Sequence, residues 1–205
     1  MNLKKIFLLL ISLPYILISN NDQLPVSFTD SLSNIKDMNE LDFEITNIPN
    51  IDSLKDWESD LKKDKNIPDL YGYEYKVSYN IFNQGTWDTL HTGDLLWRMN
   101  IVCPGAYTVN FVFEELHLSE NAHLSFYNED KDFLLGPYTN RINKTHGIFS
   151  SHLIEGFSVF MELFVPKAEL SENRFTLSKI EELTLYVIEL KKENERIKAQ
   201  LNNNK

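Results

Sequence analysis

The sequence has one cysteine, no motif for a serine nucleophile and no long hydrophobic run after its first twenty residues. Because Cys103 cannot form a disulfide within the chain, the core alone must stabilise the fold. Cys103 ends a strand-like run, which favours a buried, unreactive thiol, with an intermolecular disulfide or a reactive nucleophile as the alternative. Since no nucleophile–base pair is visible either, the sequence predicts a protein that is not an enzyme and that uses no cofactor.

Positive charge is also scarce. The chain has 20 Lys and Arg against 30 Asp and Glu, a net charge of -10. A chain this acidic repels a phosphate backbone, so nucleic acid is excluded as an expected partner.

The N-terminus has the pattern of a signal peptide over residues 1–19. Lys4 and Lys5 precede an apolar run over 6–18, and the small residue Ser19 follows it. The run is shorter than the about 20 residues that a membrane-spanning helix needs. We therefore expect a secreted or periplasmic protein with no stable membrane span after cleavage; an uncleaved anchor is the alternative.

Residues 20–69 are polar and acidic, with few large apolar side chains. Such a composition predicts a linker. Within it, apolar residues three or four apart predict a short amphipathic helix over 52–63, with Trp57 on its apolar face.

Residues 70–177 contain short segments in which apolar and polar residues alternate. This stretch holds 19 of the chain's 25 Phe, Trp and Tyr residues, all of them between Tyr71 and Phe175. A period of two is typical of strands with one buried face. Turn residues separate the segments at regular intervals, as in a β-sandwich. We therefore predict an all-β fold, an antiparallel, jelly-roll-like β-sandwich, with Trp97 in its core.

Several motifs in this region resemble a known family. They are Gly85-Thr-Trp, Gly93-Asp-Leu-Leu-Trp, Gly105-Ala-Tyr-Thr-Val, Ala122-His-Leu-Ser-Phe-Tyr-Asn, Leu135-Gly-Pro-Tyr-Thr-Asn and Glu162-Leu-Phe-Val-Pro. In this order they resemble the N-terminal, non-catalytic region of Bacteroidetes secreted trypsin-like serine proteases related to lysyl endopeptidase. The resemblance implies a β-sandwich that precedes a protease domain.

No protease domain follows the sandwich, and no Ser-His-Asp triad can be placed in the chain. The expected function is therefore that of an exported, non-enzymatic module for binding or assembly. Its expected partners are a protease or another extracellular protein or a glycan. The alternative is a chaperone or inhibitor, like a protease pro-region, that acts on a separate serine protease domain.

One segment resembles the start of a calcium loop. Asn128, Asp130 and Asp132 alternate with other residues, and their oxygens are ligands that calcium prefers. Phe133 stands where an EF-hand has glycine, so two interpretations remain: a calcium site of another kind, or a hairpin turn rich in Asn and Asp. The sequence predicts no other metal site.

The last segment, 178–205, has heptad spacing. The expected seam consists of Ile180, Leu183, Val187, Leu190, Asn194, Ile197 and Leu201. Ser178 and Glu181 have the spacing of a capping box at the start of such a helix. β-Branched residues at two a positions and Asn194 at a third favour a parallel two-stranded coiled coil.

This heptad helix predicts self-association into a dimer; an amphipathic helix packed on its own sandwich is the alternative. The segment also resembles the helical tails of secreted and surface proteins of Bacteroidetes.

Overall fold

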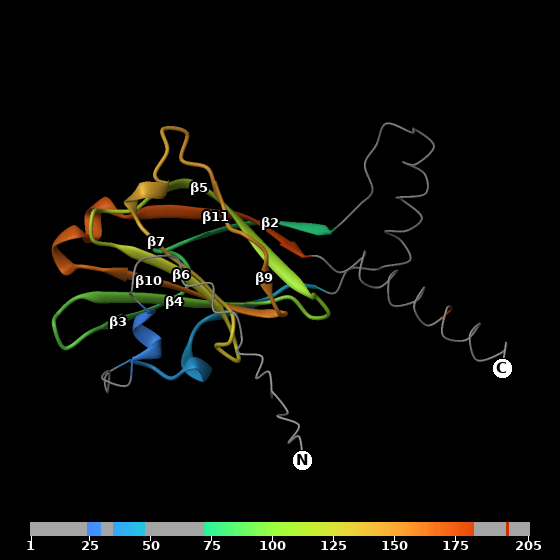
Figure 1. The fold of residues 1–205 in the computed structure, drawn as a ribbon. Coiled ribbons are helices and arrows are strands. Elements are labelled where there is room, and N and C mark those ends of the chain that lie inside the picture. Colours follow the sequence, from blue (N-terminus) through green and yellow to red (C-terminus); the bar gives the residue numbers. More distant parts are fainter. Residues whose placement is uncertain (1–23, 30–34, 48–71, 183–195, 197–205) are drawn as a thin grey trace, which may run out of the picture.

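Two β-sheets lie face to face in the structure, a computed structural model that describes residues 24–29, 35–47, 72–182 and Arg196 (Figure 1). This arrangement confirms the predicted all-β sandwich. The turn glycines Gly85, Gly93 and Gly105 all have positive φ, as sharp reversals between strands require.

Sheet A is six-stranded, in the order β1-β4-β10-β6-β7, with β3 also paired to β4. Its strands are β1 (Phe43–Ile45), β3 (Thr86–Thr89), β4 (Leu95–Val102), β6 (His123–Asn128), β7 (Leu134–Tyr138) and β10 (Ser158–Val165). β1 runs parallel to β4, whereas the other pairs are antiparallel. The predicted antiparallel sandwich is therefore confirmed, with β1 and β4 as a parallel pair within it.

Sheet B is five-stranded, in the order β2-β11-β5-β8, with β9 also paired to β5. Its strands are β2 (Tyr73–Asn80), β5 (Thr108–His117), β8 (Phe149–Ser150), β9 (Ile154–Glu155) and β11 (Arg174–Glu182). Short 3-10 helices accompany the sheets: η1 (Val26–Phe28), η2 (Met38–Glu40), η3 (Asn140–Ile142) and η4 (Lys167–Glu172).

The core lies between the sheets and is rich in aromatic rings. Phe113 of β5 lies 5.9 Å from Phe126 of β6, measured between ring centroids, and 5.3 Å from Phe175. Trp97 and Cys103 are fully buried, as predicted. The Trp97 Nε1 donates a hydrogen bond of 2.9 Å to the Gln84 carbonyl oxygen. The neighbouring Gly85 has a φ of +87°, and a Cβ atom there would overlap the indole ring.

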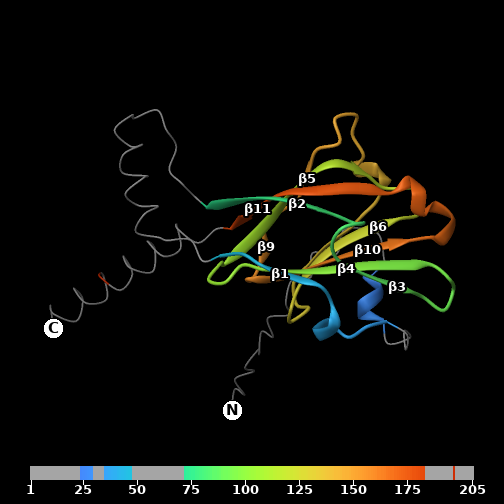
Figure 2. The same cartoon turned by 180° about the vertical axis from the view of Figure 1, so that it is seen from behind.

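The described parts of the predicted linker pack against the sandwich. Figures 1 and 2 show η1 and η2 on the side of sheet A that faces away from sheet B. Leu41 is buried with Tyr127, Leu134 and Phe160 in a second, smaller apolar cluster. Residues 24–29 and 35–47 are therefore part of the folded unit, which begins well before the predicted boundary at residue 70.

The C-terminal prediction needs a similar correction. Ser178, Ile180 and Glu181 belong to strand β11, not to a helix. Ile180 is buried in the sandwich core, so it is unavailable to a coiled coil, and the Ser178 hydroxyl donates to the Val112 carbonyl oxygen instead of capping a helix. A β-bulge between Leu177 and Lys179 places Leu177 and Ile180 on the same face, a three-residue spacing that imitates a helix.

Several other predictions lie outside the described residues. They are the signal peptide over 1–19, the short helix over 52–63, and the seam positions Leu183, Val187, Leu190, Asn194, Ile197 and Leu201. Arg196, which is described, is helical and exposed.

Candidate binding face on sheet A

The outer face of sheet A carries a row of polar side chains across four strands. The strand register aligns Thr86 of β3, Arg98 of β4, Glu162 of β10 and Ser125 of β6. A row on an outer face is normally solvated, but Arg98 is 1% exposed and Glu162 is 2% exposed. Something must therefore cover this row.

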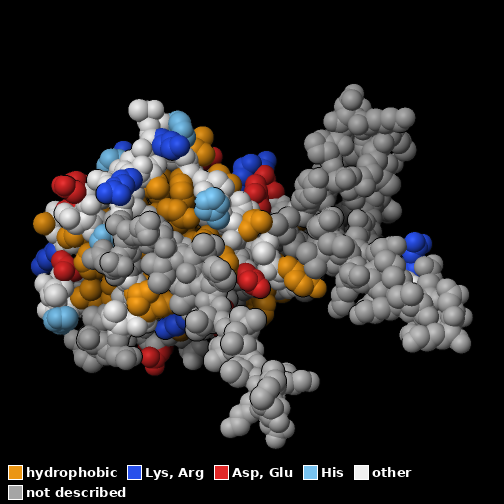
Figure 3. All heavy atoms as spheres, in the orientation of Figure 1, with side chains coloured by type: hydrophobic (Ala, Val, Ile, Leu, Met, Phe, Trp, Pro, Cys, Tyr) orange, Lys and Arg blue, Asp and Glu red, His pale blue; other side chains and the backbone are white. Residues whose placement is uncertain are grey.

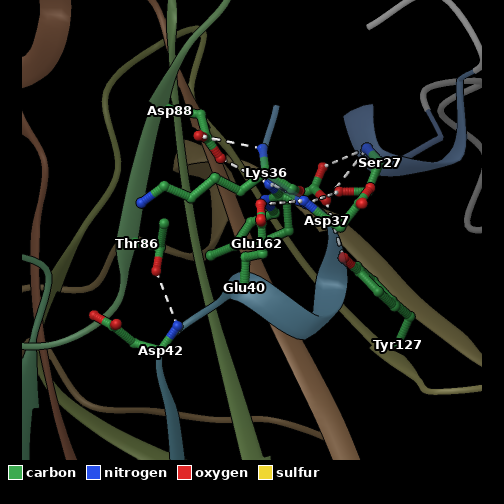
Figure 4. Close-up of polar contacts among 10 residues, drawn as sticks. Ser27, Lys36, Asp37, Glu40, Asp42, Thr86, Asp88, Tyr127 and Glu162 are labelled. Atoms are coloured by element: carbon green, nitrogen blue, oxygen red, sulfur yellow. Dashed lines mark hydrogen bonds and ion pairs between the residues drawn. The ribbon is translucent and has the colours of Figure 1, made fainter. Parts of the chain in front are cut away.

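The cover is formed by residues 24–29 and 35–42, which we call the strap. It contacts the row through backbone groups, and its side chains Phe28, Met38 and Leu41 pack in the smaller apolar cluster with Tyr127 and Phe160. Figure 4 shows dashed lines from the backbone nitrogens of strap residues Ser27, Lys36 and Asp42 to Glu162, Asp88 and Thr86 of the sheet, respectively. The Asp42 N–H donates to the Thr86 hydroxyl over 2.9 Å.

An ion pair holds one part of the strap. The Arg98 guanidinium lies 2.7 Å from Asp88 Oδ2, and both side chains are almost completely buried. The same Arg98 nitrogen donates to the Lys36 carbonyl oxygen over 2.7 Å, while the Lys36 N–H donates to Asp88 Oδ1 over 3.4 Å. The pair thus satisfies both backbone groups of a single strap residue.

Glu162 and Lys131 hold Ser27 in a similar way. The Ser27 N–H lies 3.3 Å from each oxygen of the Glu162 carboxylate. The Lys131 ammonium donates to the Ser27 carbonyl oxygen over 3.0 Å and lies 5.2 Å from the centre of the Phe28 ring. Ser27 and Lys36 are therefore each bound through the backbone, the N–H by an acidic side chain and the C=O by a basic one.

Aromatic contacts complete the attachment. Phe28 of the strap meets Tyr127 edge to face, with ring centroids 4.9 Å apart, and Tyr127 stacks on Phe160 of the neighbouring strand. The Tyr127 hydroxyl donates to Glu162 over 3.2 Å. Tyr127 thus contacts both the Phe28 ring of the strap and the Glu162 carboxylate that binds Ser27.

Burial determines the protonation of this face. It raises the pKa of the Glu162 carboxyl above its ordinary value, although hydrogen bonds from Ser27 and the positive charge of Arg98 act in the opposite direction. Burial also raises the pKa of the Tyr127 phenol, and the negative charge of Glu162 adds to that effect. For His123, burial lowers the pKa, and the charge of Glu169 partly opposes it. The environment therefore favours the neutral form of all three groups.

A cavity of about 110 Å³ lies between the strap and the sheet. Leu24, Pro25 and Val26 form its strap side. Its sheet side consists of His123, Ser125, Pro137, Glu162 and Phe164. The rings of His123 and Phe164 are stacked, with centroids 5.8 Å apart. The cavity thus combines apolar walls with one buried carboxyl group.

The three residues of the calcium candidate lie at the end of β6 and in the turn between β6 and β7. The Asn128 side chain accepts a hydrogen bond from the Phe133 N–H and donates one of 2.6 Å to Asp132, while Asp130 is exposed. These contacts are those of an Asn-rich hairpin turn, and a calcium site at this turn stays a prediction. Within the described residues, no group of three or more His, Cys, Asp or Glu side chains is placed to hold a metal ion.

Sequence reasoning missed the two charged residues that define this face. Arg98 alternates with Trp97 and Met99, so a period of two places it on the outer face but does not indicate that this face is covered. A signal for Glu162 was nevertheless present, since it is the one charged residue in the apolar run Ser158–Val165. A lone carboxylate within such a run indicates a buried polar contact.

Figure 3 shows acidic, basic and apolar side chains interspersed on the face seen in Figure 1. Within the described part of the chain, no helix has the length and apolarity needed to cross a membrane. Comparisons with protein-family models, with curated proteins and with solved structures found no match.

Proposed function

We propose that this protein is an exported, non-enzymatic β-sandwich module that binds extended protein segments on the outer face of sheet A. One observation carries this proposal. Ser27 and Lys36 each have both their backbone N–H and their backbone C=O hydrogen-bonded to side chains of the sandwich. Binding through hydrogen bonds to backbone groups depends little on the sequence of the bound segment. A segment from another protein can therefore make the same contacts when the strap is displaced.

The experiment measures binding of a labelled peptide with the sequence of residues 24–42 to the chain produced without residues 1–19. In the wild type, the strap of the same chain competes at a high effective concentration. Ser27→Pro removes the N–H that donates a hydrogen bond to Glu162, and so weakens the binding of the competing strap. We expect this variant to bind the peptide at least about tenfold more tightly than the wild type does.

The control variants test which contacts matter. Lys131→Ala, added to Ser27→Pro, should weaken peptide binding, because Lys131 donates to the Ser27 carbonyl oxygen. Lys144→Ala removes a lysine from a different surface, beside His146 and Arg174, and should leave binding unchanged. Failure of a folded Ser27→Pro variant to bind the peptide would overturn the proposal.

Self-association through the C-terminal segment is a further part of the proposal. Because β11 extends to Glu182, the deletion that tests it must begin at residue 183 and not at Ser178. We expect the intact chain to be a dimer and the chain that ends at Glu182 to be a folded monomer. Light scattering measures the molar mass and so the number of chains per particle. The same number for both proteins would contradict this expectation.

A further inference from the structure

A hollow of about 490 Å³ lies at the end of sheet B, away from the strap. Its sides come from the end of β5, the start of β11 and the loop 143–148, which follows η3 and projects from the sandwich (Figure 1). The polar side chains that line it are His117, Lys144, His146, Arg174, Thr145 and Glu115. Lys and Arg outnumber Glu here by two to one. The whole chain has the opposite balance, with 30 Asp and Glu against 20 Lys and Arg.

The two positive charges of the hollow are available to a ligand. Within the described part of the chain, neither Lys144 nor Arg174 takes part in an ion pair, so Glu115 does not neutralise them directly. The strand register pairs Arg174 of β11 with His117 of β5, which places these two side chains next to each other on one face of the sheet. A guanidinium offers a planar fork of N–H donors that matches the oxygens of a carboxylate, phosphate or sulfate group.

Backbone contacts fix the walls of the hollow. A β-bulge interrupts the pairing of β5 with β11 at this point, and Glu115 has a φ of +53°. The Gly147 carbonyl oxygen accepts from the Leu116 N–H over 2.8 Å, and a Cβ atom on Gly147 would lie only 3.0 Å from the Glu115 Cα. The Asn143 side chain accepts from the Leu118 N–H over 2.9 Å and donates to the Leu118 carbonyl oxygen over 2.7 Å. The loop is therefore attached to β5 on both sides of its lining residues.

This attachment matters for binding, because a wall that is already ordered loses little conformational freedom when a ligand arrives. Backbone strain of the kind found at Glu115 also clusters at functional sites.

His146 is oriented as a donor. Its Nδ1 accepts a hydrogen bond of 3.0 Å from the Ile148 N–H, so the ring hydrogen lies on Nε2. That Nε2–H can donate to an oxygen atom of a ligand. Together with the ammonium of Lys144 and the guanidinium of Arg174, it makes the hollow rich in donors.

The size and the polarity of the hollow indicate the class of ligand. Its volume of about 490 Å³ lies within the roughly 300–1,000 Å³ of ordinary ligand sites and leaves room for more than an inorganic anion. The Thr145 hydroxyl and the Glu115 carboxylate are suited to hydroxyl groups of a ligand, since both accept hydrogen bonds. A ligand with several hydroxyl groups and one negative charge matches both sets of residues.

We propose that this hollow binds a sugar unit that carries a sulfate or carboxylate group. Arg174, Lys144 and His146 bind the negatively charged group, and Glu115 and Thr145 accept from hydroxyl groups of the sugar ring. This site goes beyond the proposed function, because none of its lining residues belongs to the strap or to the face that the strap covers.

The test uses glucose 6-sulfate and glucuronate as probes, glucose as the matched neutral sugar, and the chain produced without residues 1–19. NMR signals of the His117 and His146 rings report binding at the hollow itself. We expect saturable shifts with at least one charged sugar, with a dissociation constant on the order of 1 mM, and at least about tenfold weaker binding of glucose. The charged sugar that binds more tightly identifies the preferred group as sulfate or carboxylate.

Three variants test the role of the two positive charges. Arg174→Gln and Lys144→Gln should each weaken binding of the charged sugar by about tenfold, because each removes a charge-assisted hydrogen bond. Lys76→Gln removes the same charge from the exposed side of β2 and should leave the affinity within about twofold of the wild type.

Four results would overturn the proposal. They are the absence of saturable shifts with both charged sugars, equal affinity for glucose, equal weakening by Lys76→Gln, and binding of inorganic sulfate as tight as that of glucose 6-sulfate. The last result would mean that the hollow holds an anion without recognising a sugar. Peptide binding by Ser27→Pro is measured separately, so a failure of this site leaves the proposed function to its own test.

Discussion

The two outer faces of the sandwich each carry an ion pair of nearly the same length in a very different environment. On sheet A, Arg98 and Asp88 are 2.7 Å apart, with side chains 1% and 7% exposed. On sheet B, Lys179 and Glu74 are 2.8 Å apart, with side chains 38% and 35% exposed. Distance alone would rank the two pairs as equal.

The difference between the two pairs comes from the strap. Sheet B keeps its pair in water, where screening and side-chain freedom leave little net stabilisation. Sheet A has its pair under a peptide segment, where it is shielded from water and also binds the backbone of Lys36. A buried ion pair of this kind stabilises the fold little more than two apolar side chains in its place would. Removing one partner, however, leaves a buried charge without a counter-ion.

The largest loss of stability is expected from a change in the core between the sheets, with which the changes on the two outer faces can be compared. Trp97→Ala should destabilise the protein by ~3–5 kcal/mol, because it empties a fully buried aromatic site. Chemical denaturation measures the loss. An unchanged midpoint would mean that Trp97 is on the surface in solution.

Removal of one partner of the buried pair should have an effect of similar size. Asp88→Ala leaves Arg98 buried without its counter-ion and the Lys36 N–H without its acceptor, so we expect a loss of ~3–5 kcal/mol. The double variant Arg98→Met with Asp88→Leu removes both charges and should recover much of this loss. If Asp88→Ala alone is nearly neutral, the strap does not shield the pair.

Glu162 should make the stability of the protein depend on pH. Its pKa is raised in the folded state, so between the ordinary value of 4.5 and the raised one the folded protein holds a proton that the unfolded chain has released. The contribution of Glu162 is therefore fully present below 4.5 and is lost as the pH rises through the raised pKa. Denaturation series at several pH values should show this loss in the wild type but not in Glu162→Gln. A constant difference between the two proteins would mean that the carboxylate is solvated.

The exposed pair should have the smallest effect. Lys179→Ala should leave the Tm unchanged within error, and added salt should not enlarge the difference, because the pair is already screened by solvent. A clear drop in Tm, comparable to that of Asp88→Ala, would remove the contrast between the two faces.

The sequence predicted the sandwich because its strands alternate apolar and polar residues with few exceptions. It did not predict the burial of Arg98, since alternation identifies the face turned to the core and assumes that the other face meets water. The strap was missed because it has few apolar anchors, Phe28, Met38 and Leu41, and otherwise binds through the backbone of Ser27 and Lys36, which leaves no trace in composition. The end of strand β11 was misassigned from Ser178 onward because Ile180 fits the spacing of the heptad seam, while a bulge between Leu177 and Lys179 interrupts the two-residue period of the strand.

The chain passes from the strap directly into β1, and this small strand has a consequence for solubility. β1 and β3 lie one after the other along the same edge of β4, where β3 pairs with Leu95–Arg98 and β1 pairs with Asn100–Val102. An uncovered β4 edge would offer unpaired backbone groups to other chains, which is how sheets aggregate. β1 leaves an edge of only three residues in its place, although Phe43 and Ile45 on it are more than half exposed. Release of the strap together with β1 would therefore promote aggregation along this edge as well as uncover a binding face.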